Sequence, residues 1–375
     1  MTAPLQTHPA LRVVLAHDWL TGMRGGERVL EWLCRSYPEA PILTLIHNRA
    51  AISETINSHR VITSWLQRIP GIESFYRRTL PLMPSAASAL KAPPSDLLIS
   101  SSHCVAKGMR AYPGSKHLCY CFTPMRYAWT FQEEYFGSNP LKKKLLRPLL
   151  GALRQWDRRS AGQVDRFVAI SEHVRDRIRR FYDRDADVVY PPVDTGYFTQ
   201  GSVPDAGSYD LVVSALVPYK RIDLAIRAYT ELGWPLRIVG SGTEVESLQM
   251  ISGPSIQWMG RMEDAALREQ YRGCRMLIFP GEEDFGIVPV EAMACGRPVV
   301  AFARGGAAET VVRDRTGLFF ERQTVDDLVR AIREAAARSW NSADIRAHAE
   351  SFGVSRFLTG LSESIQSVMD SGSRR

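Results

Sequence analysis

One stretch decides the predicted fold: FPGEEDFGIVPVEAMACG, residues 279–296. The apolar residues up to Phe279 predict a strand, and Gly281 predicts the turn that follows it. A helix is predicted to begin near Ile287, directly after Gly286, whose missing side chain lets the backbone come close to a ligand. A strand that passes through a glycine turn into a helix is typical of a parallel α/β sheet.

The same stretch predicts a site for a phosphorylated ligand. Free backbone N–H groups and the positive end of the helix dipole suit a phosphate at the helix start. Glu283 precedes this helix and Glu291 lies inside it, slightly more than two helical turns away. We expect both carboxylates at one edge of a cleft, one accepting hydrogen bonds from sugar hydroxyls and the other from ribose hydroxyls. Two ordinary surface carboxylates and a plain turn are the alternative.

Outward from this stretch, strands and helices alternate along two halves of the chain. Strands are predicted at 11–16, 41–46, 96–101, 117–122 and 166–170, and again at 210–215, 236–239, 256–259, 276–279 and 298–302. A segment rich in Gly, Ser, Pro and Asp separates the halves before Ser208 and is interpreted as a linker. The pattern predicts two Rossmann-like α/β domains at 1–200 and 201–355. A C-terminal helix is predicted at 356–375, and packing of this helix on the first domain is one of the arrangements that the sequence allows.

Composition restricts the class of protein. The chain has 375 residues, of which 45% are hydrophobic and 23% charged, the balance of an ordinary globular protein. Its six cysteines have no zinc or disulfide spacing. The polar N-terminus has no apolar signal core, so a cytoplasmic protein is expected. The net charge of +7 favours anionic partners, without choosing among phosphates, lipids and nucleic acid.

The E-x7-E pattern from Glu283 to Glu291 resembles the signature of GT4-type retaining glycosyltransferases, the glycosyl transferases group 1. The trailing segments GRPVVA at 296–301 and GGAAE at 305–309 are also similar to that family. The resemblance implies a GT-B fold, in which two Rossmann-like α/β domains face each other across a cleft. It covers most of the chain and is more specific in the second half.

The resemblance assigns the donor sugar to Glu283 as a catalytic residue and the ribose to Glu291. It implies that sugar and diphosphate contact four consecutive backbone amides, those of Phe285, Gly286, Ile287 and Val288. No metal ion or other cofactor is expected, because no D-x-D pair lies where a metal-bridged diphosphate would need it.

A basic residue of the family that binds the diphosphate matches Lys220, and we expect it to stabilise the leaving group. The family usually has an arginine five positions earlier, where this chain has Ala215. We hypothesise that Arg221 or Arg261 supplies the second positive charge; Arg221 on a solvated helix face is the alternative. Gly260 and Arg261 resemble the family's base-binding edge.

In the first half, Gly25 and Gly26 match a glycine loop that closes over the diphosphate in the family. His103, after a predicted strand, matches a histidine that lies near the donor sugar. Arg126 lies in a segment similar to an acceptor-side motif of one bacterial polysaccharide branch and is expected to bind an acceptor phosphate. That branch commonly has a histidine where this chain has Phe122.

The resemblance to O-antigen mannosyltransferases implies transfer of a hexose, with GDP-mannose the favoured donor, to a glycan or a polyprenyl-diphosphate-linked acceptor. No nucleic-acid partner is expected. A basic amphipathic stretch at 142–159 and the segment 75–78 predict peripheral docking on the inner face of the cell membrane, with a solvated helix as the alternative. A nucleotide-sugar epimerase and an inactive nucleotide-binding scaffold remain competing functions. A nicotinamide dehydrogenase is disfavoured, because the chain has no G-x-G-x-x-G fingerprint.

Overall fold

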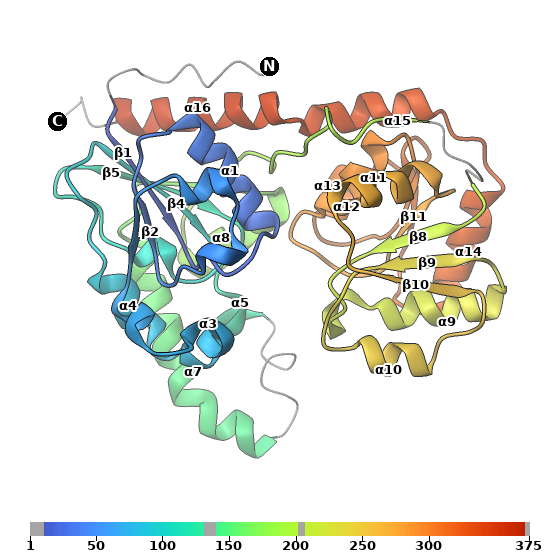
Figure 1. Ribbon diagram of the computed structural model, residues 1–375, viewed down its shortest axis with the longest axis horizontal. Coiled ribbons are helices and arrows are strands. Elements are labelled where there is room, and N and C mark those ends of the chain that lie inside the picture. Colours follow the sequence, from blue (N-terminus) through green and yellow to red (C-terminus); the bar gives the residue numbers. More distant parts are fainter. Residues whose placement is uncertain (1–10, 131–139, 202–206, 372–375) are drawn as a thin grey trace. The chain divides into compact units, whose positions relative to one another are not determined.

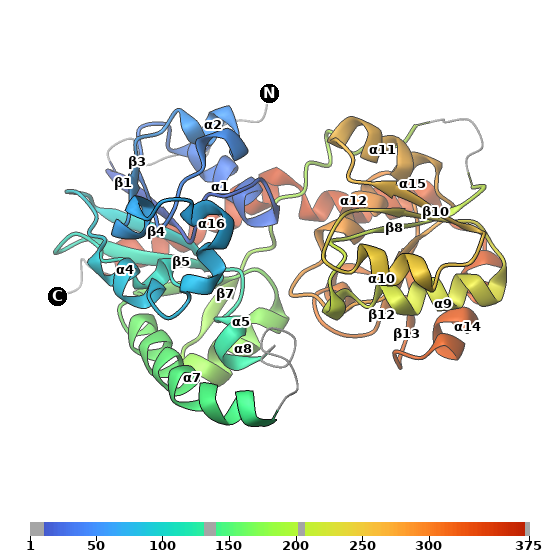
Figure 2. The ribbon, with the colours of Figure 1, turned by 60° about the horizontal axis from the view of Figure 1, so that its bottom comes forward.

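The computed structural model describes residues 11–130, 140–201 and 207–371, which form two compact units. Unit 1 combines Met1–Tyr190 with Leu358–Arg375, and unit 2 is Pro191–Phe357. In each unit, helices lie on both sides of a sheet whose strand pairs are all parallel (Figures 1 and 2). Parallel sheets between two helical layers confirm the predicted α/β class.

The sheet of unit 1 has seven strands among the described residues, in the order β3-β2-β1-β4-β5-β6-β7. Its strands are β1 (Val13–His17), β2 (Ile42–Thr44), β3 (Val61–Thr63), β4 (Leu97–Ser102), β5 (Lys116–Cys121), β6 (Arg166–Ala169) and β7 (Ala186–Val188). Its helices are α1 (Gly25–Ser36), α2 (Glu54–Asn57), α3 (Ile72–Phe75), α4 (Met83–Ala89), α5 (Arg126–Trp129), α7 (Pro140–Ala161) and α8 (Glu172–Tyr182), joined by 3₁₀ turns that include η4 (Ala106–Gly108).

The core of unit 1 follows from the alternation of strand side chains. Val14 and Ala16 of β1 join a buried cluster that Met83 of α4 and Leu153 of α7 complete. The intervening Leu15 is also fully buried, as both faces of a sheet covered by helices require. The last helix, α16 (Val354–Asp370), begins in unit 2 and continues in unit 1.

The sheet of unit 2 has six strands among its described residues, in the order β10-β9-β8-β11-β12-β13. Its strands are β8 (Asp210–Val213), β9 (Leu236–Val239), β10 (Ile256–Gly260), β11 (Leu277–Phe279), β12 (Val299–Phe302) and β13 (Gly317–Phe320). Its helices are α9 (Ile222–Leu232), α10 (Val245–Met250), α11 (Asp264–Gly273), α12 (Ile287–Ala294), α13 (Ala307–Thr310), α14 (Val325–Ala336) and α15 (Ser342–Ala349), and η5 (Pro218–Lys220) precedes α9.

One expectation about local structure is wrong. Gly25 and Gly26 were expected in a loop, but they form the first turn of α1. Arg24 precedes the helix in an extended conformation, and its backbone N–H donates to the Glu27 carboxylate at 3.1 Å. This contact supports the helix start two residues earlier than the apolar pattern indicates, because it satisfies a backbone donor at the helix end.

The short strands β3, β7 and β13 are absent from the sequence prediction. Each has three or four residues, too few for a clear alternation of side chains. None of the described helices combines the length and the apolar character that crossing a lipid bilayer requires.

Candidate functional site

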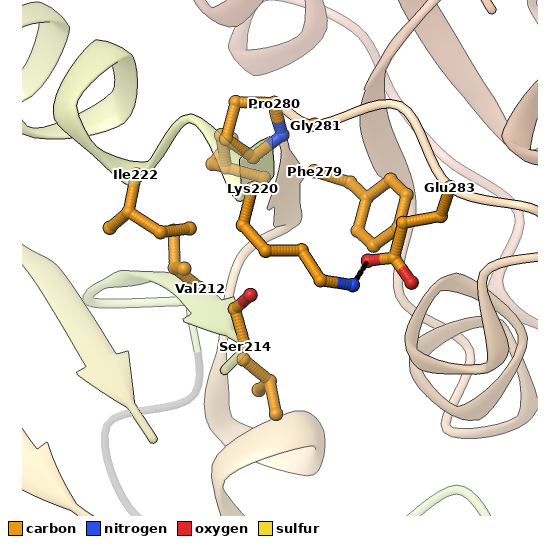
Figure 3. Close-up of a pocket in the computed structure, with 10 residues that line it drawn as sticks. Val212, Ser214, Lys220, Ile222, Phe279, Pro280, Gly281 and Glu283 are labelled. Carbon is orange, nitrogen blue, oxygen red and sulfur yellow. Dashed lines mark ion pairs between the residues drawn. The ribbon is translucent and has the colours of Figure 1, made fainter. Parts of the chain in front are cut away.

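The carboxyl ends of β8 and β11, neighbouring strands of unit 2, carry the two charged residues of a pocket. Lys220 lies in η5, after β8, and Glu283 in the loop after β11. Figure 3 shows the Lys220 Nζ directed at Glu283 Oε1, with which it forms an ion pair. Their side chains are 13% and 22% exposed, so the pair is partly screened from water yet accessible. The other lining residues are Val212, Val213, Ser214, Ile222, Ile278, Phe279, Pro280 and Gly281.

Two glycines hold the loop that contains Glu283. The backbone N–H of Gly306 donates to the carbonyl of Glu283 at 2.8 Å. A Cβ at Gly305 would collide with that carbonyl, and a Cβ at Gly306 would collide with the backbone of Phe285. The backbone of the GGAAE segment therefore packs directly against the backbone of the E-x7-E segment, and glycine is needed at Gly305 and Gly306 because a side chain would not fit there.

The start of α12 offers backbone donors beside this loop. Gly286 precedes the helix with φ 86°, a conformation that favours glycine. Ile287 and Val288 occupy the first turn, where backbone N–H groups have no carbonyl partner within the helix. Pro289 follows them and lacks an N–H, so it sacrifices no helical hydrogen bond. Phe285 is buried, with its ring 6.0 Å from that of Phe352.

Glu291 lies further along α12 and has a partner that sequence reasoning missed. Its Oε2 accepts a hydrogen bond of 2.7 Å from the hydroxyl of Tyr271, a fully buried residue of α11. Burial, followed by the nearby Glu291 charge, raises the pKa of Tyr271 well above its usual range, so the phenol remains a donor. Glu291 is not among the residues that line the Lys220 pocket. Tyr271 carries no local sequence signal, because the contact joins residues from two helices.

The two candidates for a second positive charge are in different environments. Arg221 has its guanidinium on Asp223, with Nε 3.1 Å from Oδ1, and also donates to Gln323 at 3.2 Å. Gln323 in turn donates to the carbonyl of Pro280 at 2.9 Å, so Arg221 helps to join α9 to the pocket loop. Arg261, directly after Gly260 at the end of β10, is exposed and pairs with no acid that the structure describes. The second-charge hypothesis remains a prediction for either residue.

In unit 1, His103 follows β4 and contacts an acidic residue that sequence reasoning missed. Its Nδ1 lies 2.9 Å from Oδ2 of Asp18, which is buried directly after β1. Asp18 also accepts the backbone N–H groups of four consecutive residues, at 2.6 to 3.1 Å: His103, Cys104, Val105 and Ala106. Burial alone raises the pKa of Asp18, but His103 and these N–H donors outweigh burial and hold the pKa well below its usual range.

The glycines of α1 lie close to the same cluster. A Cβ at Gly26 would lie 3.4 Å from the His17 ring and 3.4 Å from the Phe122 ring. The Phe122 ring centroid lies 6.3 Å from that of His17 and 6.4 Å from that of His103. The structure therefore brings Gly26 and His103 to one edge of the unit 1 sheet, with Gly25 at the first position of α1.

Arg126 is the first residue of α5 and is half-buried. The other end of this short helix is anchored by Trp129, whose indole N–H donates to Asp157 Oδ2 at 2.7 Å. The carbonyl of Ala128 also accepts a hydrogen bond of 2.8 Å from Arg154 of α7. α7 thus anchors α5, and the role of Arg126 in binding an acceptor remains a prediction.

Sequence comparison identifies both halves of the chain. Residues 14–197 match the family model for Glycosyltransferase Family 4, and residues 200–351 match that for Glycosyl transferases group 1. A D-inositol 3-phosphate glycosyltransferase of Mycobacteroides abscessus is 32% identical over 200 residues, covering 47% of this chain and 45% of that protein. A GDP-mannose-dependent alpha-(1-6)-phosphatidylinositol monomannoside mannosyltransferase of Mycolicibacterium smegmatis is 32% identical over 216 residues, covering 48% of this chain and 55% of that protein.

The chain spans about half the length of the curated relatives it matches. Among solved structures, HepE of Anabaena in complex with UDP-glucose is similar with a TM-score of 0.70 at 17% identity, covering 95% of this chain and 99% of that one. Such a likeness at low identity supports the fold, whereas the family follows from the two matched models. This chain belongs to the GT4-type glycosyltransferases, the glycosyl transferases group 1, and has their GT-B fold of two Rossmann-like units.

Proposed function

We propose that this chain is a retaining glycosyltransferase that moves a hexose from a nucleotide-diphosphate sugar to a glycan or lipid-linked acceptor in polysaccharide or O-antigen biosynthesis. The favoured donor is GDP-mannose, because a relative at 32% identity is named for its dependence on that donor. HepE was solved with UDP-glucose, so uridine-diphosphate sugars are the second class to test.

The observation that carries the proposal is the Lys220–Glu283 pair, in which η5 supplies the lysine and the loop that leads into α12 supplies the glutamate. An ammonium group and the free N–H groups of a helix start would stabilise the charge that collects on a departing diphosphate. The phosphate must then compete with Glu283 for Lys220. Once released from the lysine, the Glu283 carboxylate is free to accept hydrogen bonds from the sugar.

Retention follows if the acceptor hydroxyl enters from nearly the same face as the departing diphosphate. In this step the bond between the anomeric carbon and the phosphate oxygen breaks, and the bond to the acceptor oxygen forms. The acceptor's proton passes to the leaving phosphate, so no separate protein base is needed. We expect no metal requirement, and activity that survives a chelator would support that part of the proposal.

A screen of donor hydrolysis over nucleotide sugars tests the function. The full chain is incubated with GDP-mannose and with uridine-diphosphate sugars, with and without a simple acceptor, and the anomers are followed by NMR. We expect one donor to be cleaved and the product to keep the donor's anomeric configuration. Glu283→Gln should abolish turnover, whereas Glu321→Gln, at an exposed carboxylate of the same unit, should retain it.

The same screen separates the competing functions. An epimerised sugar that forms without an acceptor would identify an epimerase. Nucleotide binding without turnover of any sugar would identify a scaffold. Inversion at the anomeric carbon would overturn the retaining mechanism while leaving glycosyl transfer intact.

We further propose that one face of unit 1 docks on an anionic membrane. Leu145 of α7 is 81% exposed, and Arg147 of α7 and Arg78, which follows α3, are exposed as well. Leu149 of α7 and Phe75 of α3 both pack against the large buried cluster of unit 1. Apolar side chains flanked by arginines are the chemistry that interfacial binding uses. Of the lysines predicted to contribute, Lys142 and Lys143 have side chains that lie outside the described residues.

Co-sedimentation with vesicles tests the docking surface. We expect binding to phosphatidylserine-containing vesicles at low salt and weaker binding to neutral ones. Leu145→Asp should reduce binding, whereas Met250→Asp provides a matched control, because Met250 of unit 2 is also 81% exposed. Equal loss in both variants, or no binding to anionic vesicles, would contradict the proposal.

A further inference from the structure

We propose that Asp18 is a positioning residue that acts through His103, holding the proton of the imidazole on Nδ1 and leaving Nε2 to accept a hydrogen bond from a sugar hydroxyl. The inference rests on the proposed glycosyl transfer for its hydroxyl-bearing ligand. Asp18 directly follows β1 in unit 1, whereas the E-x7-E segment lies in unit 2.

The first step is that Asp18 can only accept hydrogen bonds. Its Oδ2 receives the N–H groups of His103 and Cys104, and its Oδ1 receives those of Val105 and Ala106. Backbone N–H groups are obligatory donors, and the Ser102 hydroxyl donates to Oδ1 at 3.4 Å as well, so both oxygens of Asp18 are occupied as acceptors. A fully buried carboxylate with this many donors is stable in its ionised form.

The second step assigns the tautomer of His103. Nδ1 lies 2.9 Å from the ionised Oδ2, and that distance is a hydrogen bond only if Nδ1 carries the proton. In the neutral ring the lone pair is then on Nε2. No residue that the structure describes forms a hydrogen bond with Nε2, and the side chain is 33% exposed, so an incoming hydroxyl can reach it.

The third step is that the same carboxylate fixes the position of the ring. Asp18 binds both the imidazole and the backbone that supports it, so the ring and its chain segment move together. The indole of Trp19 packs edge-on against the ring at 4.7 Å, with an interplanar angle of 87°. A partner that orients a functional imidazole in this way also increases its strength as an acceptor.

His17, a neighbouring histidine, differs from His103 in its surroundings. His17 has its Nδ1 2.8 Å from the hydroxyl of Ser101, which itself donates to the carbonyl of Ala16. Its ring is 1% exposed and faces Glu27, with Nε2 3.9 Å from Oε1. His17 is therefore enclosed by protein, and His103 is the histidine of this cluster that a substrate can contact.

The tautomer can be measured directly by ¹⁵N NMR of the full chain labelled at histidine. In the spectrum of its neutral ring, His103 should show a protonated Nδ1 and an unprotonated Nε2. The spectrum of His103→Gln assigns the signals. A wild-type signal with the proton on Nε2 would overturn the proposal, and this readout requires neither turnover nor the folding of an Asp18 variant.

A double-mutant cycle tests whether Asp18 acts through His103. Asp18→Asn should lower kcat for donor cleavage by about 10-fold to 100-fold, the scale found when the outer partner of a functional histidine is lost. In the His103→Gln background the same substitution should change kcat by no more than about twofold. Equal losses in both backgrounds would show that Asp18 only shapes the loop, and would overturn the proposal.

Asp165→Asn is the matched control, because Asp165 also accepts a backbone N–H, that of His117 at 2.7 Å, at the other end of the unit 1 sheet. It should leave kcat unchanged. If the wild-type chain cleaves no nucleotide sugar, the proposed function fails, whereas the NMR result still decides the assignment of the tautomer.

Discussion

Two sets of charged residues, one in each unit, are held in opposite ways. In unit 1, Asp18 and Asp157 are fully buried, and each is surrounded by donors from distant parts of the chain. In unit 2, Lys220 and Glu283 lie at a pocket and pair mainly with each other, while glycines shape the backbone beneath them. Buried charges must be fully paired to be tolerated, whereas an accessible pair can exchange partners with a ligand. The difference indicates that the Lys220–Glu283 pair is open to a ligand, whereas Asp18 and Asp157 keep the partners that the fold gives them.

The largest effect is expected from Lys107→Met in unit 1. The Lys107 ammonium is 2% exposed and forms an ion pair with Asp157, which also accepts from Trp129 and Tyr182. Burial lowers the pKa of Lys107, but the charge and hydrogen bond of Asp157 outweigh it and leave the pKa raised. Removing the lysine leaves a buried carboxylate without its counter-charge, at a cost of about 3–5 kcal/mol in the free energy of unfolding.

Denaturant unfolding measures this cost. Arg313→Met is the control, because it removes an exposed ion pair with Glu321 in unit 2 and should cost less than about 1 kcal/mol. Similar losses of unfolding free energy in the two variants would show that the buried ion pair contributes no more to stability than the exposed one.

The second effect is on activity. Lys220→Ala should lower kcat for donor cleavage by about 10²–10³-fold, because a group that stabilises the leaving charge is lost. Its unfolding free energy should change by less than about 1 kcal/mol, since the partner Glu283 is accessible to water once the lysine is removed. Kinetics and denaturant unfolding are measured on the same sample. Lys116→Ala, which removes a lysine of unit 1 that lies 3.9 Å from Asp165, should leave kcat unchanged. A large loss of stability in the Lys220 variant would assign it a structural role instead.

The third effect is a loss of unit 1 stability in mild acid. Burial lowers the pKa of His117 to about 4, and Asp165 offsets this only in part. Between about pH 6.5 and about pH 4 the unfolded chain binds a proton that the native ring does not, so stability falls as the pH falls. The shift corresponds to about 3 kcal/mol over that interval.

Hydrogen exchange can locate this effect. Protection of β5 should decrease between about pH 7 and about pH 5 more than that of β8, since unit 2 has His348 as its histidine and no counterpart of His117. His117→Gln should remove most of the difference. Parallel losses in the two units would argue for a general electrostatic cause.

The smallest effect on stability is expected from Gly26→Ala. The added Cβ would meet the rings of His17 and Phe122 at 3.4 Å, a tight contact, while alanine favours the helix by about 0.5–1 kcal/mol. The two terms nearly cancel, so unfolding should change by less than about 1 kcal/mol. If the start of α1 approaches the diphosphate, KM for the donor should still increase several-fold. Gly306→Ala provides the contrast, because its Cβ would collide with the Phe285 backbone and should destabilise unit 2.

Contiguous features were readable in the sequence. The strand, glycine turn and helix around Gly286 depend on neighbours within a few positions, and α12 begins at Ile287 as predicted. The two parallel sheets follow from the alternation of apolar segments. The start of α1 was not readable in this way, because the Glu27 contact that supports it competes with the low helix propensity of two glycines.

Contacts between distant segments were decided by tertiary structure alone. The parallel register of β1 and β4 places His17 opposite Ser101, and thereby brings Asp18 beside the N–H groups of the segment that follows β4. In the same way, packing of α11 against α12 gives Glu291 its partner Tyr271, and packing of α14 against α9 brings Gln323 to Arg221. Propensity and periodicity act over single turns and strands, whereas a side-chain partner is set by strand register and helix packing, which exist only once the chain has folded.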